Sequence, residues 1–134
     1  AVTRLDRRRA WRWGPAVGWA TVVVVASLVD PPGAATATTG PFGVLPADKW
    51  QHGLGYALLG GLVARSFGRS TLRAALLAVG VVVAVGVGVE VLQSFVPWRT
   101  ASLLDGTANA VGALVGVGGW QLAAKRSPGR WERS

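Results

Sequence analysis

The sequence predicts an all-α integral membrane protein, a polytopic bundle of four transmembrane helices with both termini in the cytoplasm. Two observations favour this fold class. Of the 134 residues, 51% are apolar and only 15% are charged, whereas about a quarter of the residues of a soluble domain are charged. The apolar residues form long runs with short basic blocks between them, which is the pattern of a membrane protein. The length allows one domain, residues 1–134.

The first predicted span is residues 13–29, preceded by a basic arm, residues 1–12, that shows no helical apolar stripe. This run is short, because a span takes about 20 apolar residues, with a range of roughly 17–25. A secretory signal is the alternative, with Ala35-Thr36-Ala37 as an A-x-A cleavage site. We favour a retained span, and both interpretations put residue 38 on the outer side of the membrane.

Three further spans are predicted, at residues 47–64, 74–96 and 103–124. Residues 30–46 hold four of the seven prolines and three glycines, a composition typical of a loop. The third span is long enough to cross the bilayer with some tilt.

The basic residues predict the orientation of these spans. With four crossings, the basic arm, the connector 65–73 and the tail 125–134 lie on one side of the membrane. Only Lys49 and Arg99 lie on the other side. Because cytoplasmic loops carry an excess of Lys and Arg, the arm, connector and tail are assigned to the cytoplasm.

Each of the last three spans carries polar residues in its outer half. Spacings of three or four residues place them on one face of each helix: Asp48, His52 and Tyr56, then Glu90 and Gln93, then Asp105 and Asn109. Polar and ionisable residues inside a span are costly and usually face protein or water. The sequence therefore predicts one shared polar site just below the outer surface.

Small residues on the same helices favour close packing of these faces. Gly53, Ala57 and Gly61 form a small-xxx-small ridge on the second span, and Gly112 and Gly116 continue the polar stripe of the fourth. Small residues let membrane helices approach closely. We therefore expect the polar faces to point into the bundle.

Structural roles are the alternatives for most of these residues. Asp48 could cap the second helix, and Ser102-x-x-Asp105 has the pattern of a capping box. Gln93 and Asn109 would suit interhelical hydrogen bonds. Packing or interfacial roles are the alternatives for Tyr56, Lys49 and Arg99.

The ordered motifs resemble those of the VanZ-like family of small polytopic membrane proteins. The motifs are Asp48-Lys49-x-x-His52-x-x-x-Tyr56, Glu90-x-x-Gln93, Arg99, and Asp105-x-x-x-Asn109-x-x-Gly112-x-x-x-Gly116. The resemblance covers residues 48–116 and implies an envelope-facing membrane protein, from a family linked to resistance to the glycopeptide teicoplanin. It also implies a shared site made of Asp48, Lys49, His52, Glu90, Gln93, Arg99, Asp105 and Asn109.

We expect a pocket, open to the outer leaflet, that binds an anionic lipid headgroup or a lipid-linked envelope precursor. Lys49 and Arg99 would hold phosphate or carboxylate. The candidate catalytic residues are Glu90 and His52, as an acid–base or proton-sensing pair, and Asp105, which would orient a partner. The remaining candidate substrate-binding residues are Asp48, Gln93, Asn109 and Tyr56.

Two other functions fit the same residues. A proton-coupled transporter would use acidic and histidine side chains as a relay, and four spans would then need a homo-oligomer to enclose a path. A non-catalytic scaffold subunit would use the polar stripes only to hold its helices together. A metal site formed by His52, Glu90 and Asp105 is a further alternative, but one histidine and no cysteine make a weak ligand set, so no cofactor is expected. Nucleic acid is not an expected partner, because no basic and aromatic surface is left outside the spans.

Overall fold

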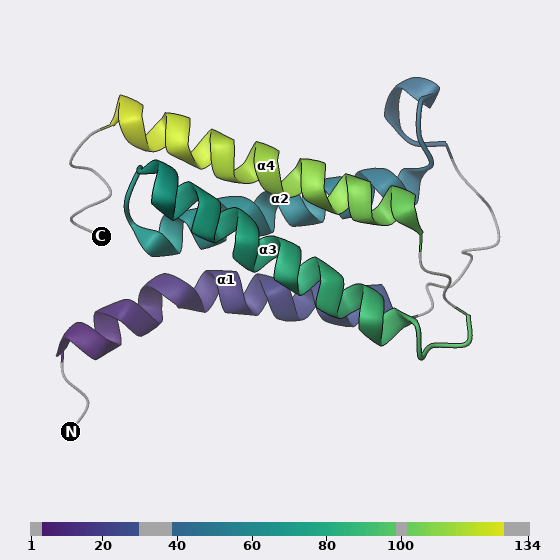
Figure 1. Cartoon of the computed structure of the whole chain (residues 1–134), viewed down its shortest axis with the longest axis horizontal. Helices are drawn as coiled ribbons and strands as arrows, with labels where there is room; N and C mark the ends of the chain where they lie inside the picture. The colour runs from purple at the N-terminus through teal and green to yellow at the C-terminus, as the bar shows by residue number, and fades with distance from the viewer. Residues whose placement is uncertain (1–3, 30–38, 99–101, 128–134) are drawn as a thin grey trace.

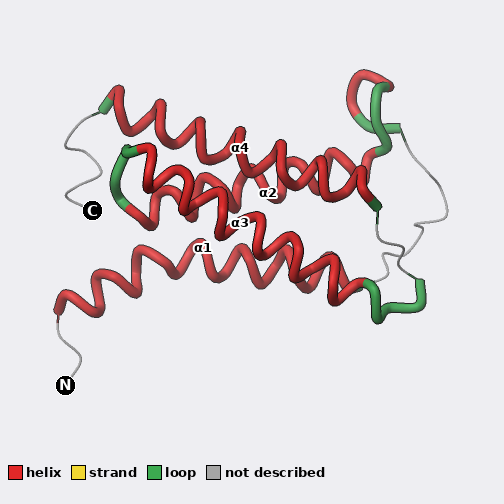
Figure 2. The backbone as a smooth tube through the Cα atoms, in the orientation of Figure 1, coloured by secondary structure: helices red, strands yellow, loops and turns green. Residues whose placement is uncertain are grey.

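The computed structural model describes residues 4–29, 39–98 and 102–127, and it confirms the all-α fold class for them (Figure 1). Four helices account for most of these residues: α1 Arg4–Leu28, α2 Ala47–Phe67, α3 Leu72–Gln93 and α4 Leu103–Arg126. A short 3-10 helix, η1 Pro41–Gly43, precedes α2. No strand occurs in the described residues (Figure 2).

The four helices run alternately in opposite directions along one long axis (Figure 1). The start of α1, the turn between α2 and α3, and the end of α4 therefore lie together. We call this the basic end, because it carries Arg7, Arg8, Arg12, Arg65, Arg69, Arg73, Lys125 and Arg126. The opposite end, which we call the polar end, carries Asp48, Lys49, Glu90 and Asp105. Helix α2 contacts the other three helices, and its contact with α4 is the most extensive.

Local sequence explains how the tight turn at the basic end forms. Helix α2 ends at Phe67 and is followed by the C-cap residue Gly68, which has a left-handed backbone (φ 64°, ψ 18°) and whose N–H donates to the carbonyl of Arg65. Glycine adopts this conformation without the steric penalty of a Cβ. Helix α3 then starts at the N-cap Thr71, whose hydroxyl accepts a hydrogen bond of 3.2 Å from the N–H of Ala74.

The predicted small-residue faces are confirmed where α2 meets α4. A Cβ added at Gly112 would clash with the carbonyl oxygen of Gly53, and one added at Gly116 would clash with the carbonyl oxygen of Ala57. A Cβ added at Gly61 would lie 3.6 Å from the carbonyl oxygen of Gly116. The two backbones are therefore in direct contact, and this contact fixes the register of α4 against α2.

The helices begin and end within three residues of the predicted spans, except at the start of α1. Helix α1 begins at Arg4, so the described part of the basic arm is helical. Arginine, alanine and leucine favour helix intrinsically, even without an apolar stripe. Helix α3 ends at Gln93 rather than at residue 96, because the chain turns there. The N–H of Phe95 donates to the carbonyl of Leu92, and the N–H of Val96 donates to the carbonyl of Gln93. The proposed cleavage site at residues 35–37 and Arg99 lie outside the described residues.

One of the described helices is long and apolar enough to cross a membrane. This helix is α3, with a mean hydropathy of 2.5 over its most apolar window and only 22% of that window buried inside the protein. The other helices carry charged residues or many glycines, which lower their mean hydropathy. The structure thus supplies one candidate span in the described residues.

Candidate functional site

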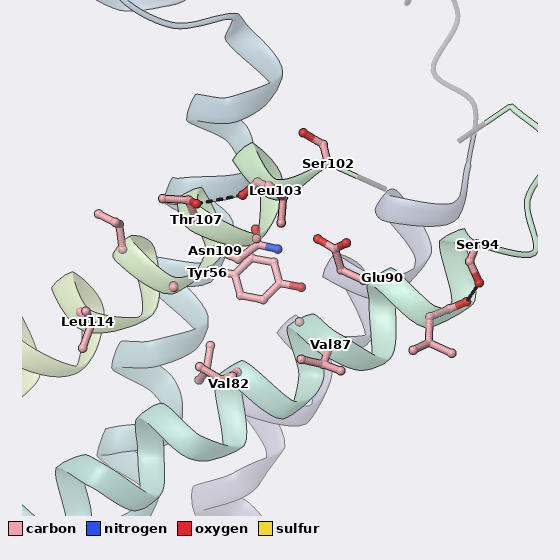
Figure 3. A pocket seen from close by; sticks show the side chains of 16 residues that line it. Tyr56, Val82, Val87, Glu90, Ser94, Ser102, Leu103, Thr107, Asn109 and Leu114 are labelled. Atoms are coloured by element: carbon pink, nitrogen blue, oxygen red, sulfur yellow. Dashed lines mark hydrogen bonds between the residues drawn. The ribbon is translucent and has the colours of Figure 1, made fainter. Parts of the chain in front are cut away.

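A groove of about 730 Å³ lies between α3 and α4, and its floor includes Tyr56 of α2 (Figure 3). Aliphatic side chains form most of its walls, among them Val83 and Val87 of α3 and Val111 and Leu114 of α4. Polar side chains gather in the part of the groove nearer the polar end of the bundle. The groove is therefore amphipathic along its length.

Among the polar side chains that line this groove are three from three different helices: Tyr56 of α2, Glu90 of α3 and Asn109 of α4. Tyr56 is 1% exposed and Asn109 is 7% exposed. The Tyr56 hydroxyl, Oε1 of Glu90 and Oδ1 of Asn109 are buried, and none has a hydrogen-bond partner among the described residues. Leaving such a group unpaired costs about 1–3 kcal/mol, so this set is suited to the polar part of a ligand.

Glycines bring these side chains close to one another. A Cβ added at Gly86, one turn before Glu90, would lie 3.3 Å from the Tyr56 ring, so glycine lets the ring lie against α3. A Cβ added at Gly106 would lie 3.7 Å from Oε1 of Glu90, which places that carboxyl group over the first turn of α4. Of the residues expected in one shared polar site, Tyr56, Glu90 and Asn109 line this groove together. The expectation of a single site is wrong for Asp48, His52, Gln93 and Asp105, which lie elsewhere in the bundle.

Lys49 lies at the polar end, between α2 and α4, and not in the groove. Its ammonium group is 2.7 Å from a carboxylate oxygen of Asp48 and is also hydrogen-bonded to Asp105. The side chains of Lys49 and Asp105 are 14% and 15% exposed, whereas that of Asp48 is 55% exposed. Two carboxylates therefore neutralise the cation that we expected to hold an anion.

Asp105 holds the start of α4 to α2 through this ion pair. The N-cap of α4 is Ser102, which makes no side-chain capping hydrogen bond, so the capping-box interpretation is not supported. Asp105 lies in the first turn of α4, where the helix dipole favours a negative charge.

His52 lines a second cavity, of about 360 Å³, between α1 and α2. Trp19 and Ser27 of α1 line it too, and the Trp19 indole N–H donates to the carbonyl of Gly55 at 2.9 Å. The expected acid–base pair of His52 and Glu90 is thus divided between two cavities, and Tyr56 is the polar residue common to both.

Gln93 is buried and lies outside the groove. Its side-chain amide donates a hydrogen bond of 2.9 Å to the carbonyl of Ser27 in α1. This contact confirms the structural alternative for Gln93, an interhelical hydrogen bond.

The structure adds residues that the sequence did not single out. Ser94 and Thr107 line the groove, but their hydroxyls donate to the carbonyls of Val91 and Leu103 in their own helices. Helix α1, to which we assigned no site residue, contributes Trp19 and Ser27 to the second cavity. Ser27 gave one signal, a hydroxyl that follows four valines and an alanine near the end of an apolar run. In the described residues, no group of three or more His, Asp or Glu side chains is placed to hold a metal ion.

Comparisons of this chain with family models, curated proteins and solved structures give no match. The resemblance to the VanZ-like family therefore rests on the motifs alone.

Proposed function

We propose that this protein is a VanZ-like, four-span membrane protein that binds the head group of a lipid or lipid-linked envelope precursor. Its binding site is the groove between α3 and α4. The observation that carries the proposal is the composition of that groove: aliphatic walls lead to the unpaired polar atoms of Tyr56, Glu90 and Asn109. An amphiphile presents the same two parts, an apolar chain and a polar head.

Exposed apolar side chains support a location in the bilayer. Every helix carries them, for example Val25 in α1, Leu54 in α2, Val87 in α3 and Val115 in α4. Soluble monomers rarely expose large contiguous apolar surfaces. The small buried fraction of α3 also supports a location in the bilayer, because a core helix of a soluble protein would be mostly buried.

The unequal distribution of basic residues between the two ends of the bundle supports an orientation with the basic end in the cytoplasm. Most described Lys and Arg residues lie at the basic end, and Lys49 lies at the polar end. Since cytoplasmic segments are rich in Lys and Arg, we place the basic end, and with it both termini, in the cytoplasm. The polar part of the groove then lies in the outer half of the membrane.

The anionic part of a head group is assigned to Lys49 and Arg99, as the motifs imply. Lys49 already pairs with Asp48 and Asp105, so an anion bound there would have to replace one carboxylate. The anion contact is therefore secondary in our proposal, and the groove is primary.

Blocking the groove tests the proposal. Gly106→Leu places a branched side chain beside Glu90 without a clash at its Cβ, and Gly119→Leu is the matched control because nothing lies within 4 Å of its Cβ. The purified proteins would be equilibrated with phosphatidylethanolamine, phosphatidylcholine and phosphatidylglycerol of identical acyl chains. Bound lipid per protein would be counted by native mass spectrometry. We expect Gly106→Leu to lose lipid that the wild type and Gly119→Leu retain, and equal retention by all three would refute lipid binding in the groove.

A further inference from the structure

We infer that the groove selects a membrane lipid whose head group carries a primary ammonium, with Glu90 as the charged contact. This inference rests on the proposed function and specifies its ligand. It follows from the charges around the groove, from the hydrogen-bonding groups in it and from its size.

The charged residues around the groove favour a cationic ligand group. Among the described residues that line the groove, Glu90 is the ionisable acid and no Lys, Arg or His is present. Lys49, the cation at the same end of the bundle, is engaged by two carboxylates. A carboxylate taken out of water is stabilised by an opposite charge with hydrogen-bond donors. Within the described chain, no cation is placed in the groove to supply it, so the cationic part of a head group fits beside Glu90 and its phosphate is expected to lie away from that carboxylate.

The hydrogen-bonding groups narrow the class of cation. A primary ammonium has three N–H donors. The unpaired buried atoms in the groove are three oxygens, one each from Tyr56, Glu90 and Asn109. The Asn109 amide can turn either its oxygen or its NH₂ group toward the ligand. A quaternary trimethylammonium has the charge but no N–H to donate, so it satisfies none of these acceptors.

The shape of the groove identifies the source of the ammonium as a lipid. Its volume of about 730 Å³ lies inside the range of roughly 300–1,000 Å³ that is usual for small-molecule sites. A free amine would fill only the polar part. The aliphatic wall formed by Val83, Val87, Val111 and Leu114 continues away from it, as an acyl chain attached to the head group requires.

The experiment compares three lipids with identical acyl chains in competition for the full-length protein. Phosphatidylethanolamine offers a primary ammonium, phosphatidylcholine a quaternary one, and phosphatidylglycerol no cation. We expect the wild type to retain phosphatidylethanolamine about tenfold or more over each of the others, the ratio given by one charge-assisted hydrogen bond. This comparison needs no variant, so it does not depend on how any substitution folds.

Variants then locate the preference. Glu90→Gln should remove it, Glu90→Asp should keep most of it because the charge is retained, and Tyr56→Phe should weaken it. Thr21→Val is the control for loss of a hydroxyl, because Thr21 is exposed and its hydroxyl donates to the carbonyl of Val17 in α1.

Retention of phosphatidylglycerol or phosphatidylcholine as strongly as phosphatidylethanolamine, blocked by Gly106→Leu, would overturn the ammonium inference and leave the proposed function standing. An unchanged preference in Glu90→Gln would also overturn it. Lipid retention that Gly106→Leu does not affect would instead overturn the proposed function.

Discussion

At the scale of single residues, the polar side chains of this protein divide into paired and unpaired groups. Lys49 and Gln93 have partners on neighbouring helices and hold the bundle together. Tyr56, Glu90 and Asn109 share one groove, and each keeps a buried atom that has no hydrogen-bond partner in the described part of the chain. A scaffold whose polar stripes served only to join helices would have paired these atoms too. The division therefore favours a binding site over a purely structural role.

The ion pair of Lys49 gives a prediction at this scale. Asp105→Asn removes the interhelical contact of the cation, whereas Asp48→Asn removes a contact within α2 that is half exposed. We expect Asp105→Asn to lower the free energy of unfolding by about 1–3 kcal/mol and Asp48→Asn by about 0–1 kcal/mol. Thermal unfolding in detergent, followed by circular dichroism, would compare them, and an equal loss in both variants would contradict the assignment.

At the scale of helices, the contact between α2 and α4 leaves no room for a side chain. Gly112→Ala would force its Cβ against the carbonyl of Gly53, whereas Gly118→Ala would meet no atom within 4 Å. Overpacking of this kind costs about 1–3 kcal/mol, so Gly112→Ala should lower the unfolding temperature and Gly118→Ala should not. The same detergent assay measures both, and a stable Gly112→Ala protein would mean that the helices are further apart than described.

Helix positions were predictable from sequence to the extent that strong local signals mark them. Pro46 and Ser102 are residue types that commonly precede a helix, and they occupy the N-cap positions of α2 and α4. Both helices therefore start where the sequence predicts. Helix α3 ends at Gln93, earlier than predicted, because the N–H groups of Phe95 and Val96 form turn hydrogen bonds. The prediction extended to residue 96 because both residues continue the apolar run. Hydropathy does not distinguish a turn made by the backbone from a further turn of helix.

The sequence predicted that Tyr56, Glu90 and Asn109 lie near one another, but it did not predict that His52 lies apart from them. Spacing places Asp48, His52 and Tyr56 on one face of α2, and that face is wide enough to meet two neighbours. In the structure His52 lies toward α1 while the Tyr56 hydroxyl lies toward α3. Which neighbour each side chain meets depends on how the helices pack, and no local pattern in the sequence records it.

At the scale of the whole molecule, the two ends of the bundle differ in charge, and this difference predicts its orientation. The chain has no cysteine, so single-cysteine variants carry one unique label. Val44 is 73% exposed before α2, at the polar end, and Ser70 is exposed in the turn at the basic end. We expect an impermeant maleimide to label Val44→Cys in intact cells and Ser70→Cys only after the membrane is permeabilised. The reverse pattern would invert the orientation, and equal labelling would refute a membrane-embedded bundle.

The ring of Tyr56 is a wall common to both cavities. Because one side chain lines both cavities, we expect a ligand that moves the Tyr56 ring in the groove to change the shape of the cavity lined by Trp19 and His52 as well. We expect Tyr56→Ala to enlarge both cavities. One aromatic partition thus separates the acid of α3 from the imidazole of α2.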